Sequence, residues 1–452
     1  MSDTTYVGPM ADPQKRERLE RITKTNFGKL MPLMIIVYII AFIDRTNIGM
    51  AKAALETDIG LTAAAYGLGA GLFFFAYALL EVPSNLIMHK VGARFWIARI
   101  MITWGIISML MAVVWNEMSF YVLRVLLGAA EAGLYPGMIL YITFWFPRKD
   151  RARAIGLFLL GVSLANIIGA PLGGLLLQMD GFGGLHGWQW MFILEGLPAV
   201  GLAFLVWFWL PDRPRDAHWL SDADKDLVEQ QLAAEDDGVG NEAHGFRSLI
   251  PVAKDPIIWL VIAVYFTHQV AVYSLSYFLP AMISSFNAEM TTVTIGLITA
   301  VPWIAAAIGS VLMPKLGTTL VRQKAMVTGG LWSVAVGLVI AAMSGGNLVL
   351  AVVGFSFSAF WFFVIQSMLF TFPARRLTGA AVAAGIALVN TFGLFGGFFG
   401  PTMMGALESS TGNPLAGLWF IIGLALVGGL LAFGLKGSVR ESAAQTPVSQ
   451  KA

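Results

Sequence analysis

The sequence contains no cysteine and few charged residues. The absence of cysteine among its 452 residues excludes disulfides, thiolate metal sites and thiol-based catalysis. Charged residues make up only 12% of the chain and hydrophobic residues 57%, whereas a soluble domain has roughly 25% charged residues. The net charge of +2 gives no reason to expect a nucleic-acid partner. The composition therefore excludes an ordinary soluble protein and indicates a chain that lies in a lipid bilayer.

Several functional signals are also missing. The polar N-terminal residues lack the apolar core of a signal peptide, so we expect the first membrane helix to direct insertion. No apolar run carries metal-ligand spacing, a nucleophile with a paired base, or a phosphate-binding loop. We therefore expect no enzyme activity, no metal and no cofactor.

Long apolar runs recur along the whole chain. Each is close to the ~20 residues that a helix needs to cross a bilayer, and backbone groups in lipid must be paired within the segment, which favours helices. The runs cover approximately residues 28–50, 64–88, 95–115, 118–145, 153–177, 190–210, 256–283, 293–313, 324–343, 347–372, 379–405 and 414–435. The sequence predicts an all-α membrane protein with about twelve transmembrane helices.

An internal repeat divides the chain into two halves. Residues 84–108 resemble residues 309–333, half a chain length further on. Repeats of this kind are typical of secondary transporters, whose site lies between the halves. We therefore predict two six-helix bundles related by pseudo-two-fold symmetry. The expected organisation is a cytoplasmic tail at 1–27, a bundle at 28–210, a cytoplasmic linker at 211–250, a bundle at 251–437 and a cytoplasmic tail at 438–452.

The linker is polar and carries charges of both signs, with a short helix predicted at Asp222–Ala234. It is interpreted as a plain connection between the bundles, with a regulatory docking segment as the alternative.

Lysine and arginine cluster in alternate connections between the runs. The odd-numbered connections contain only Lys52. Because cytoplasmic loops carry an excess of basic residues, both termini are predicted to be cytoplasmic. The basic residues of the first tail and of the even-numbered connections are Lys15, Arg16, Arg18, Arg21, Lys24, Lys29, Lys90, Arg94, Arg148, Lys149, Arg151, Arg153, Lys315, Arg322, Lys324, Arg375 and Arg376.

Charged residues interrupt two of the apolar runs. Asp44 and Arg45 lie in the first, and Arg124 and Glu131 lie in the fourth. A charge at bilayer depth costs about 2.5 to 3.5 kcal/mol and marks a pathway by default. Glu131 follows Arg124 by two helical turns, on the same face. We expect the four groups to meet in one water-filled crevice between the first and fourth helices.

Two interpretations of these charges remain open. In one, the carboxylates only neutralise the arginines and hold the helices in register. In the other, the arginines bind an anion, because a guanidinium group offers a rigid fork of donors that matches a carboxylate. A substrate carboxylate that takes over an arginine leaves Asp44 or Glu131 without a counter-charge, so that acid takes up a proton. Substrate and proton binding then favour each other, as symport requires.

Three segments resemble the anion:cation symporters of the major facilitator superfamily. They are FIDRTNIGMA (42–51), EVPSNLIMHKVGARFWIAR (81–99) and RVLLGAAEAGLYPG (124–137). The likeness extends over the whole length and is closest to the bacterial tartrate, phthalate, hydroxyphenylacetate and hexonate permeases. This family takes up organic acids with protons across the inner membrane.

The resemblance implies roles for individual residues. Asp44 and Glu131 fall at the family's proton-linked carboxylates, and Arg45 and Arg124 at its motif arginines. The remaining candidates for substrate binding are Asn47, Tyr77, Gln269, Tyr273, Ser274 and Asn390, the last four from segments that resemble the seventh and eleventh helices. Leu394-Phe395 stands where the family often has a second asparagine and more glycine, which points to a smaller or more aromatic-friendly pocket.

The leading hypothesis is a proton-coupled importer of a small hydroxy, aldonic or aromatic carboxylate by alternating access. Its expected partners are the organic anion, protons and the lipid bilayer of the inner membrane. One chain supplies both halves, so a monomer is expected. The alternative is a facilitator or antiporter for neutral solutes or drugs, in which the buried charges are structural.

Overall fold

The computed structural model describes residues 12–236, 252–377 and 380–436, and all regular structure in these ranges is helical. Polar side chains fix several of the helix starts. Thr62 accepts a hydrogen bond from the amide of Ala65 at 3.1 Å, and Asp255 accepts one from the amide of Ile257 at 2.9 Å. These N-caps satisfy amides that the first helical turn leaves unpaired. The apolar runs can therefore begin as helices at the edge of the bilayer.

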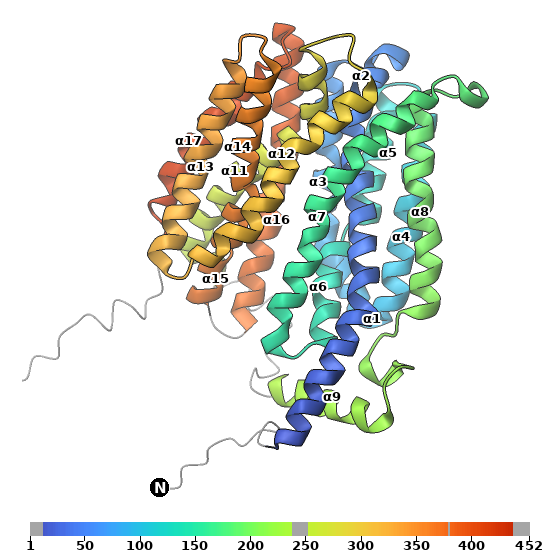
Figure 1. The fold of residues 1–452 in the computed structure, drawn as a ribbon, viewed down its shortest axis with the longest axis vertical. Helices are drawn as coiled ribbons and strands as arrows, with labels where there is room; N and C mark the ends of the chain where they lie inside the picture. Colours follow the sequence, from blue (N-terminus) through green and yellow to red (C-terminus); the bar gives the residue numbers. More distant parts are fainter. Residues whose placement is uncertain (1–11, 237–251, 378–379, 437–452) are drawn as a thin grey trace, which may run out of the picture.

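The first half of the chain forms one bundle, drawn from blue to green in Figure 1. Its helices are α1 (Pro13–Thr46), α2 (Ile48–Ile59), α3 (Ala63–Val91), α4 (Ala93–Leu110), α5 (Glu117–Glu131), α6 (Leu134–Trp145), α7 (Arg148–Leu176) and α8 (Gly187–Trp209). The linker helix α9 (Asp222–Asp236) follows. This confirms the short helix predicted at Asp222–Ala234.

The second half forms the other bundle, drawn from yellow to red. Its helices are α11 (Pro256–Ser284), α12 (Thr292–Leu312), α13 (Leu320–Ala342), α14 (Leu348–Leu369), α15 (Thr371–Arg376), α16 (Ala380–Thr411) and α17 (Gly417–Ala432). Within the described ranges, eleven helices are long and apolar enough to cross a membrane. The sixteen-residue α17 is apolar but shorter than these eleven, so the described residues contain eleven of the about twelve spans predicted. The predicted all-α architecture is confirmed.

The molecule has two distinct ends. Figure 1 places α9 and the start of α1 together at one end, which we call the α9 end. The bundles pack against each other through α3 with α16 and through α7 with α12. In the first bundle α3 is the second span and α7 the fifth, and in the other bundle α12 is the second span and α16 the fifth. Each second span therefore packs against the fifth span of the other bundle, as pseudo-two-fold symmetry requires.

The closest approach between the bundles lies at the opposite end. A Cβ atom on Gly67 of α3 would come within 2.3 Å of the carbonyl oxygen of Pro401 on α16, and one on Gly174 of α7 within 2.3 Å of the carbonyl of Thr292. Only glycine lets two backbones pack this closely. The bundles are therefore sealed at the end away from α9.

The fourth span differs from the prediction of one continuous helix over 118–145. The chain breaks between α5 and α6, immediately after Glu131. Gly133 adopts a φ of 92°, and a Cβ atom there would lie 2.2 Å from the Ser84 hydroxyl. Glu131 is thus the last residue of a half-helix. Interrupted helices of this kind border the binding sites of many transporters.

The linker packs against the first bundle. Arg18 Nε of α1 lies 2.6 Å from Asp224 Oδ1 of α9, and the indole of Trp219 donates to Asn26 Oδ1 at 3.0 Å. Arg148 donates its backbone amide to Glu235 at 2.8 Å. The described part of the linker is therefore docked on the bundle and not a free tether.

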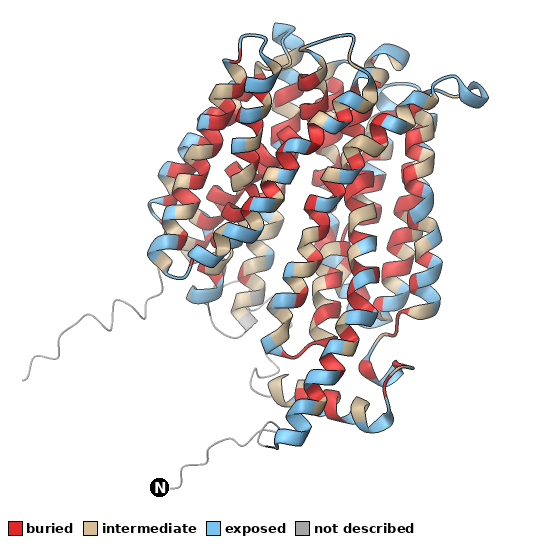
Figure 2. Cartoon of the chain, in the orientation of Figure 1, coloured by how far each residue is buried: buried red, intermediate tan, exposed pale blue. Residues whose placement is uncertain are grey.

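Buried residues lie inside each bundle, and the outer helix faces are exposed (Figure 2). Many large apolar side chains face outwards, including Phe208, which is 79% exposed, Val349 and Leu430. So much exposed apolar surface is incompatible with water and fits contact with lipid.

Gly67→Val tests the seal at the opposite end. The added side chain must push α16 away, so we expect that end to open. A cysteine placed at the fully buried Ala70 should then react faster with a maleimide, an assay that the cysteine-free sequence makes direct. Gly156→Val is the control because no atom lies within 4 Å of a Cβ there. Equal labelling of the two variants would contradict the interpretation.

Candidate functional site

A buried ion pair lies where α1 meets α5. Arg45 Nη2 is hydrogen-bonded to Glu131 Oε1, and both side chains are almost fully buried. Arg45 lies in the last turn of α1, and Glu131 is the last residue of α5, just before the break in the fourth span. The structure thus brings together one of the predicted arginines and one of the predicted acids. Arg45 Nε has no hydrogen-bond partner.

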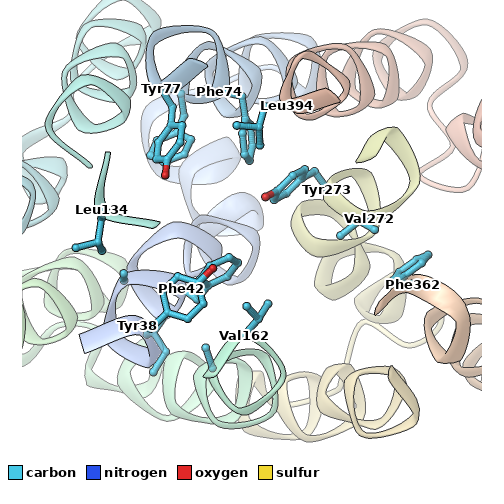
Figure 3. Close-up of a cluster of buried hydrophobic side chains, with 14 of the residues drawn as sticks. Tyr38, Phe42, Phe74, Tyr77, Leu134, Val162, Val272, Tyr273, Phe362 and Leu394 are labelled. Atoms are coloured by element: carbon cyan, nitrogen blue, oxygen red, sulfur yellow. The ribbon is translucent and has the colours of Figure 1, made fainter. Parts of the chain in front are cut away.

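Aromatic rings surround the Arg45 guanidinium. Its carbon lies 4.5 Å from the ring centre of Phe42, 5.3 Å from that of Phe73 and 5.2 Å from that of Tyr77. Figure 3 shows Tyr77 and Tyr273 pointing into the same space between the bundles. Ring faces stabilise a guanidinium group that burial has stripped of water. These rings therefore stabilise the cation without neutralising its charge, which Glu131 alone of the described acids does.

Arg124 lies next to this pair but is held differently. Its guanidinium donates to the backbone carbonyls of Gly69 and Ala70 on α3, at 3.3 and 3.4 Å. It also lies 4.9 Å from the ring centre of Phe73. No carboxylate forms an ion pair with Arg124 among the described residues, although Glu131 is close enough to interact with it electrostatically. The neighbourhood of Glu131 therefore carries one more cation than the ion pair needs.

Asp44 faces away from Arg45, although the two are consecutive. It accepts hydrogen bonds from the Trp104 indole at 2.7 Å and from the Ser108 hydroxyl at 3.0 Å, both on α4. Asn47 lies on the same side of α1, beside Glu195 of α8. Asp44 and Asn47 are thus inside the first bundle, behind the pair. The four charged groups were expected to meet in one water-filled crevice, but the structure pairs only Arg45 with Glu131, places Arg124 beside them and turns Asp44 towards α4.

The second bundle contributes neutral side chains. Tyr273 of α11 packs its ring 4.1 Å from that of Phe74 and lies beside Arg45 and Gln269. Asn390 of α16 faces the first bundle, where it donates to Glu81 at 2.9 Å. Ser274 lies against α16 instead, because a Cβ atom on Gly400 would sit 2.5 Å from its hydroxyl. Tyr273 therefore reaches Arg45, Gln269 lies beside Tyr273, Asn390 contacts the first bundle at Glu81, and Ser274 packs against α16.

Two buried acids were missing from the predicted site. Glu81 of α3 contacts α16 through Asn390, and Glu195 of α8 has no hydrogen-bond partner for either carboxylate oxygen. The signal was available, because both acids lie inside apolar runs, as Asp44 and Glu131 do. Counting charges in all of the runs identifies them.

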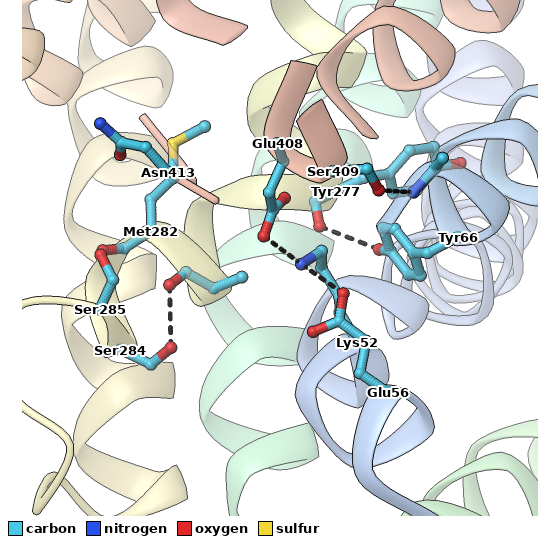
Figure 4. A network of polar contacts seen from close by, with 12 residues as sticks. Lys52, Glu56, Tyr66, Tyr277, Met282, Ser284, Ser285, Glu408, Ser409 and Asn413 are labelled. Carbon is cyan, nitrogen blue, oxygen red and sulfur yellow. Dashed lines mark hydrogen bonds and ion pairs between the residues drawn. The ribbon is translucent and has the colours of Figure 1, made fainter. Parts of the chain in front are cut away.

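Lys52 joins the bundles at the sealed end. It is buried and lies 2.8 Å from both Glu56 of its own helix and Glu408 of α16. Nearby, the Tyr66 hydroxyl donates to the backbone carbonyl of Tyr277 at 2.9 Å (Figure 4). Lys52 was assigned to a connection by the sequence, but it belongs to α2. The connections described at this end therefore lack lysine and arginine altogether.

Two helical bundles with charged groups buried beside their interface define a membrane transporter of small solutes, not an enzyme. The described residues hold no cluster of three or more histidine or acidic side chains suited to a metal. The chain belongs to the Major Facilitator Superfamily, whose family model matches residues 34–401. This agrees with the resemblance carried by the three sequence segments.

Two relatives and one solved structure illustrate the match. The chain is 39% identical to the "Inner membrane transport protein RhmT" of Escherichia coli, over 95% of this chain and 98% of that one. It is 40% identical to a "Putative tartrate transporter" of Agrobacterium vitis, over 91% and 90%. A bacterial homologue of the lysosomal transporter Spinster, inward-facing and unoccupied, superimposes with a TM-score of 0.72 at 18% identity, over 94% and 97%. This last likeness concerns the fold alone.

Arg45→Gln tests the buried pair. Because Glu131 would stay buried without its cation, we expect a loss of about 3–5 kcal/mol in unfolding free energy, seen as a lower melting temperature of the purified protein. Arg45→Gln combined with Glu131→Gln should recover part of that loss. Arg16→Gln is the control, because the Arg16–Glu20 pair is exposed and such pairs contribute little. Strictly additive losses in the double variant would show that the two groups do not interact.

Proposed function

We propose that this protein is a secondary active transporter that imports a small organic carboxylate together with protons by alternating access. The observation that carries the proposal is the buried Arg45–Glu131 pair beside the interface of the bundles. A buried ion pair seldom adds stability over apolar packing. A pair that also exchanges one partner for a substrate explains why the charges are there.

The exchange begins at Arg45. Its Nη2 group is bonded to Glu131 and its Nε group has no partner, so one donor is already free for a carboxylate oxygen. A substrate carboxylate that binds the guanidinium through two parallel hydrogen bonds displaces Glu131. Glu131 then has no ion-pair partner, because the guanidinium group of Arg124 donates to the backbone carbonyls of Gly69 and Ala70. It takes up a proton because a buried charge without a partner is costly. Substrate and proton therefore bind cooperatively.

Asp44 serves as the second proton-linked acid in this proposal. Its two oxygens accept hydrogen bonds from Trp104 and Ser108, and it forms no ion pair with a described residue. It can therefore gain or lose a proton without Arg45 changing partners. Because Asp44 and Arg45 are consecutive residues, the charge on Asp44 still acts electrostatically on Arg45. We assign Asp44 to proton coupling and not to substrate contact.

The substrate completes its contacts on the second bundle. Tyr273 lies beside the guanidinium, Gln269 lies beside Tyr273, and Asn390 lies one layer further towards the α9 end. Tyr77 of α3 places its aromatic ring beside the guanidinium group, where it can contact the substrate. A ligand held on both sides draws the bundles together, which links binding to the rocking motion of alternating access. Arg124 and Asn47 support the site from beside the pair and from behind α1.

The α9 end is assigned to the cytoplasm of a bacterial inner membrane. Connections at this end carry the lysines and arginines, and those described at the other end carry none. Both termini are then cytoplasmic. Because the bundles are sealed at the opposite end, the conformation is closed to the outside. The proposed substrates are hydroxy, aldonic and aromatic acids. The similarity to a putative tartrate transporter supports a hydroxy acid, and the ring of Tyr77 beside Arg45 suits an aromatic acid.

The first functional test is proton coupling. In proteoliposomes we expect uptake of a hydroxy acid, with tartrate and gluconate as probes, to collapse when the pH gradient is dissipated. Glu131→Gln should lose accumulation driven by the gradient but retain exchange of internal for external substrate, because a neutral residue 131 no longer needs a proton. Accumulation equal to that of the parent protein would remove Glu131 from the coupling step.

A second test separates Asp44 from Arg45. We expect Asp44→Asn to lose gradient-driven accumulation by at least tenfold while substrate affinity changes little. Arg45→Gln should weaken substrate binding itself, measured by the thermal shift of the purified protein. Arg45→Lys should restore little, because lysine lacks the fork geometry. If Arg45→Gln bound substrate normally, the alternative of a carrier for neutral solutes with structural charges would be favoured.

A further inference from the structure

Asp44 faces the interior of the first bundle, although the proposed mechanism needs it to take up protons. It is 2% exposed, and its hydrogen bonds come from Trp104 and Ser108 of α4. A proton that reaches Asp44 must therefore pass through the interior of the bundle. A second buried acid, Glu195 of α8, lies on this side of α1 and has no part in the proposed coupling.

The packing of α8 places Glu195 at the level of Asp44. The two acids are close enough to interact electrostatically. A Cβ atom on Gly196, the next residue of α8, would lie 2.9 Å from the carbonyl oxygen of Gly105. Gly105 belongs to the turn of α4 whose side chains donate to Asp44. Asp44 and Glu195 therefore share one small space where α1, α4 and α8 meet.

Four polar atoms in this space have no hydrogen-bond partner among the described residues. They are both carboxyl oxygens of Glu195 and both the amide nitrogen and the amide oxygen of Asn47. The two side chains are 4% and 5% exposed, and Asn47 lies close to Glu195. Buried polar groups are costly when unpaired, so these four atoms are expected to pair with one another.

The four atoms match one another in one protonation state of Glu195. A protonated carboxyl group donates its O–H to the amide oxygen of Asn47 and accepts from the amide N–H, which pairs all four atoms. An ionised carboxylate accepts from the amide N–H but leaves the amide oxygen unpaired. It also stands beside Asp44, and no described lysine or arginine forms an ion pair with either acid. Glu195 is therefore suited to hold a proton.

Asp44 has hydrogen-bond partners in either protonation state. The Trp104 indole only donates, and it does so to Oδ2. The Ser108 hydroxyl donates to an ionised Oδ1 and can accept from a protonated one. A proton can thus move from the Glu195 carboxyl group to Oδ1 of Asp44 without separating Asp44 from α4. Glu195 is then ionised beside one amide N–H, and it takes up the next proton because a poorly paired buried charge is costly.

A cavity at the sealed end brings solvent towards this pair. Its volume is about 270 Å³, and the residues that line it include Met50 of α2 and Trp188 of α8. Trp188 precedes Glu195 by two helical turns on the same face, or ~10 Å along the axis. Asn47, beside Glu195, lies one turn beyond Asp44 in the direction of Met50. Glu195 therefore lies on the side of Asp44 that faces the cavity.

We propose that Glu195 passes protons to Asp44 and is a further residue of the proton-coupling step. The inference rests on the proposed function, because it assumes that protonation of Asp44 drives uptake. The step is a transfer between two carboxyl groups: the O–H bond of Glu195 breaks, an O–H bond forms at Asp44, and the negative charge moves from Asp44 to Glu195. Glu195 does not contact substrate in this arrangement, so its loss should slow the delivery of protons and leave substrate binding unchanged.

Glu195→Gln tests the transfer. Glutamine has the same size, and its amide can pair with that of Asn47, but it has no proton to give up. In proteoliposomes with a pH gradient, we expect the initial rate of tartrate or gluconate uptake to fall by about tenfold or more, because a positioned proton donor is lost. Exchange of internal for external substrate should continue at about the parent rate, because it needs no net movement of protons. The thermal shift with substrate should be unchanged.

Two further variants and one spectrum separate proton transfer from packing. Glu195→Asp keeps a carboxyl group and should restore much of the lost uptake. Glu117→Gln is the control, because Glu117 is an exposed acid of the same bundle. The infrared difference spectrum of the parent protein minus Glu195→Gln should contain the C=O band of a protonated carboxylic acid, which shifts in D₂O.

Each outcome decides between the readings. Uptake by Glu195→Gln at the parent rate, or a difference spectrum without the band of a protonated acid, would overturn the inference and leave the proposed function standing. An equal loss of uptake and exchange, with a lower melting temperature, would assign Glu195 to packing and overturn it as well. Failure of the parent protein to accumulate either acid under a pH gradient would overturn the proposed function and the inference with it.

Discussion

The arrangement of the site depends on the buried ion pair between Arg45 and Glu131. A guanidinium group this deep in an apolar bundle needs a nearby negative charge, and Glu131 supplies it from the end of an interrupted helix. Three aromatic ring faces stabilise the cation further without neutralising it. In the proposed mechanism, a substrate carboxylate takes the place of Glu131 on the guanidinium group of Arg45.

The break after Glu131 is part of this arrangement. A continuous helix would carry the chain straight from Glu131 into the next turn, with its carbonyls paired within the helix. Gly133, at a φ of 92°, instead packs against Ser84 and redirects α6. The acid therefore sits at a helix end, where the partial negative charge of the helix terminus adds to its own. Both features favour a cation, or a proton, beside Glu131.

Sequence reasoning located the helices and most of the buried charges, because each depends on a local signal. A long apolar run that contains Asp44 and Arg45 can be recognised from the sequence alone. The direction in which a side chain points cannot be recognised in this way. Consecutive residues on a helix point about 100° apart, so Asp44 could join Arg45 in the crevice or face α4, and only the packing of Trp104 and Ser108 decides it. The same limit applies to Ser274.

Contacts between the two halves could not be predicted from the sequence, for a second reason. Glu81 meets Asn390, and Lys52 meets Glu408, across more than three hundred residues of sequence. Their charges are visible in the sequence, but nothing local says that an acid of the second span faces the eleventh. The internal repeat gives the symmetry of the fold. It says nothing of the chemistry at the interface, because the buried ions are confined to one half.

That confinement matters for motion. Arg45 with Glu131, and Asp44 with Trp104, are contacts within the first bundle, so they can survive a rigid rocking of one bundle against the other. The contacts that rocking must break are those between bundles, such as Lys52 with Glu408 at the sealed end. Opening that end exposes Lys52 to water, where a separated charge costs far less than in a bundle core. Arg45, Glu131 and Asp44 therefore keep their partners in such a motion, and the contacts that change are those between the bundles. In the proposed mechanism, Arg45 therefore changes its partner only when a substrate binds.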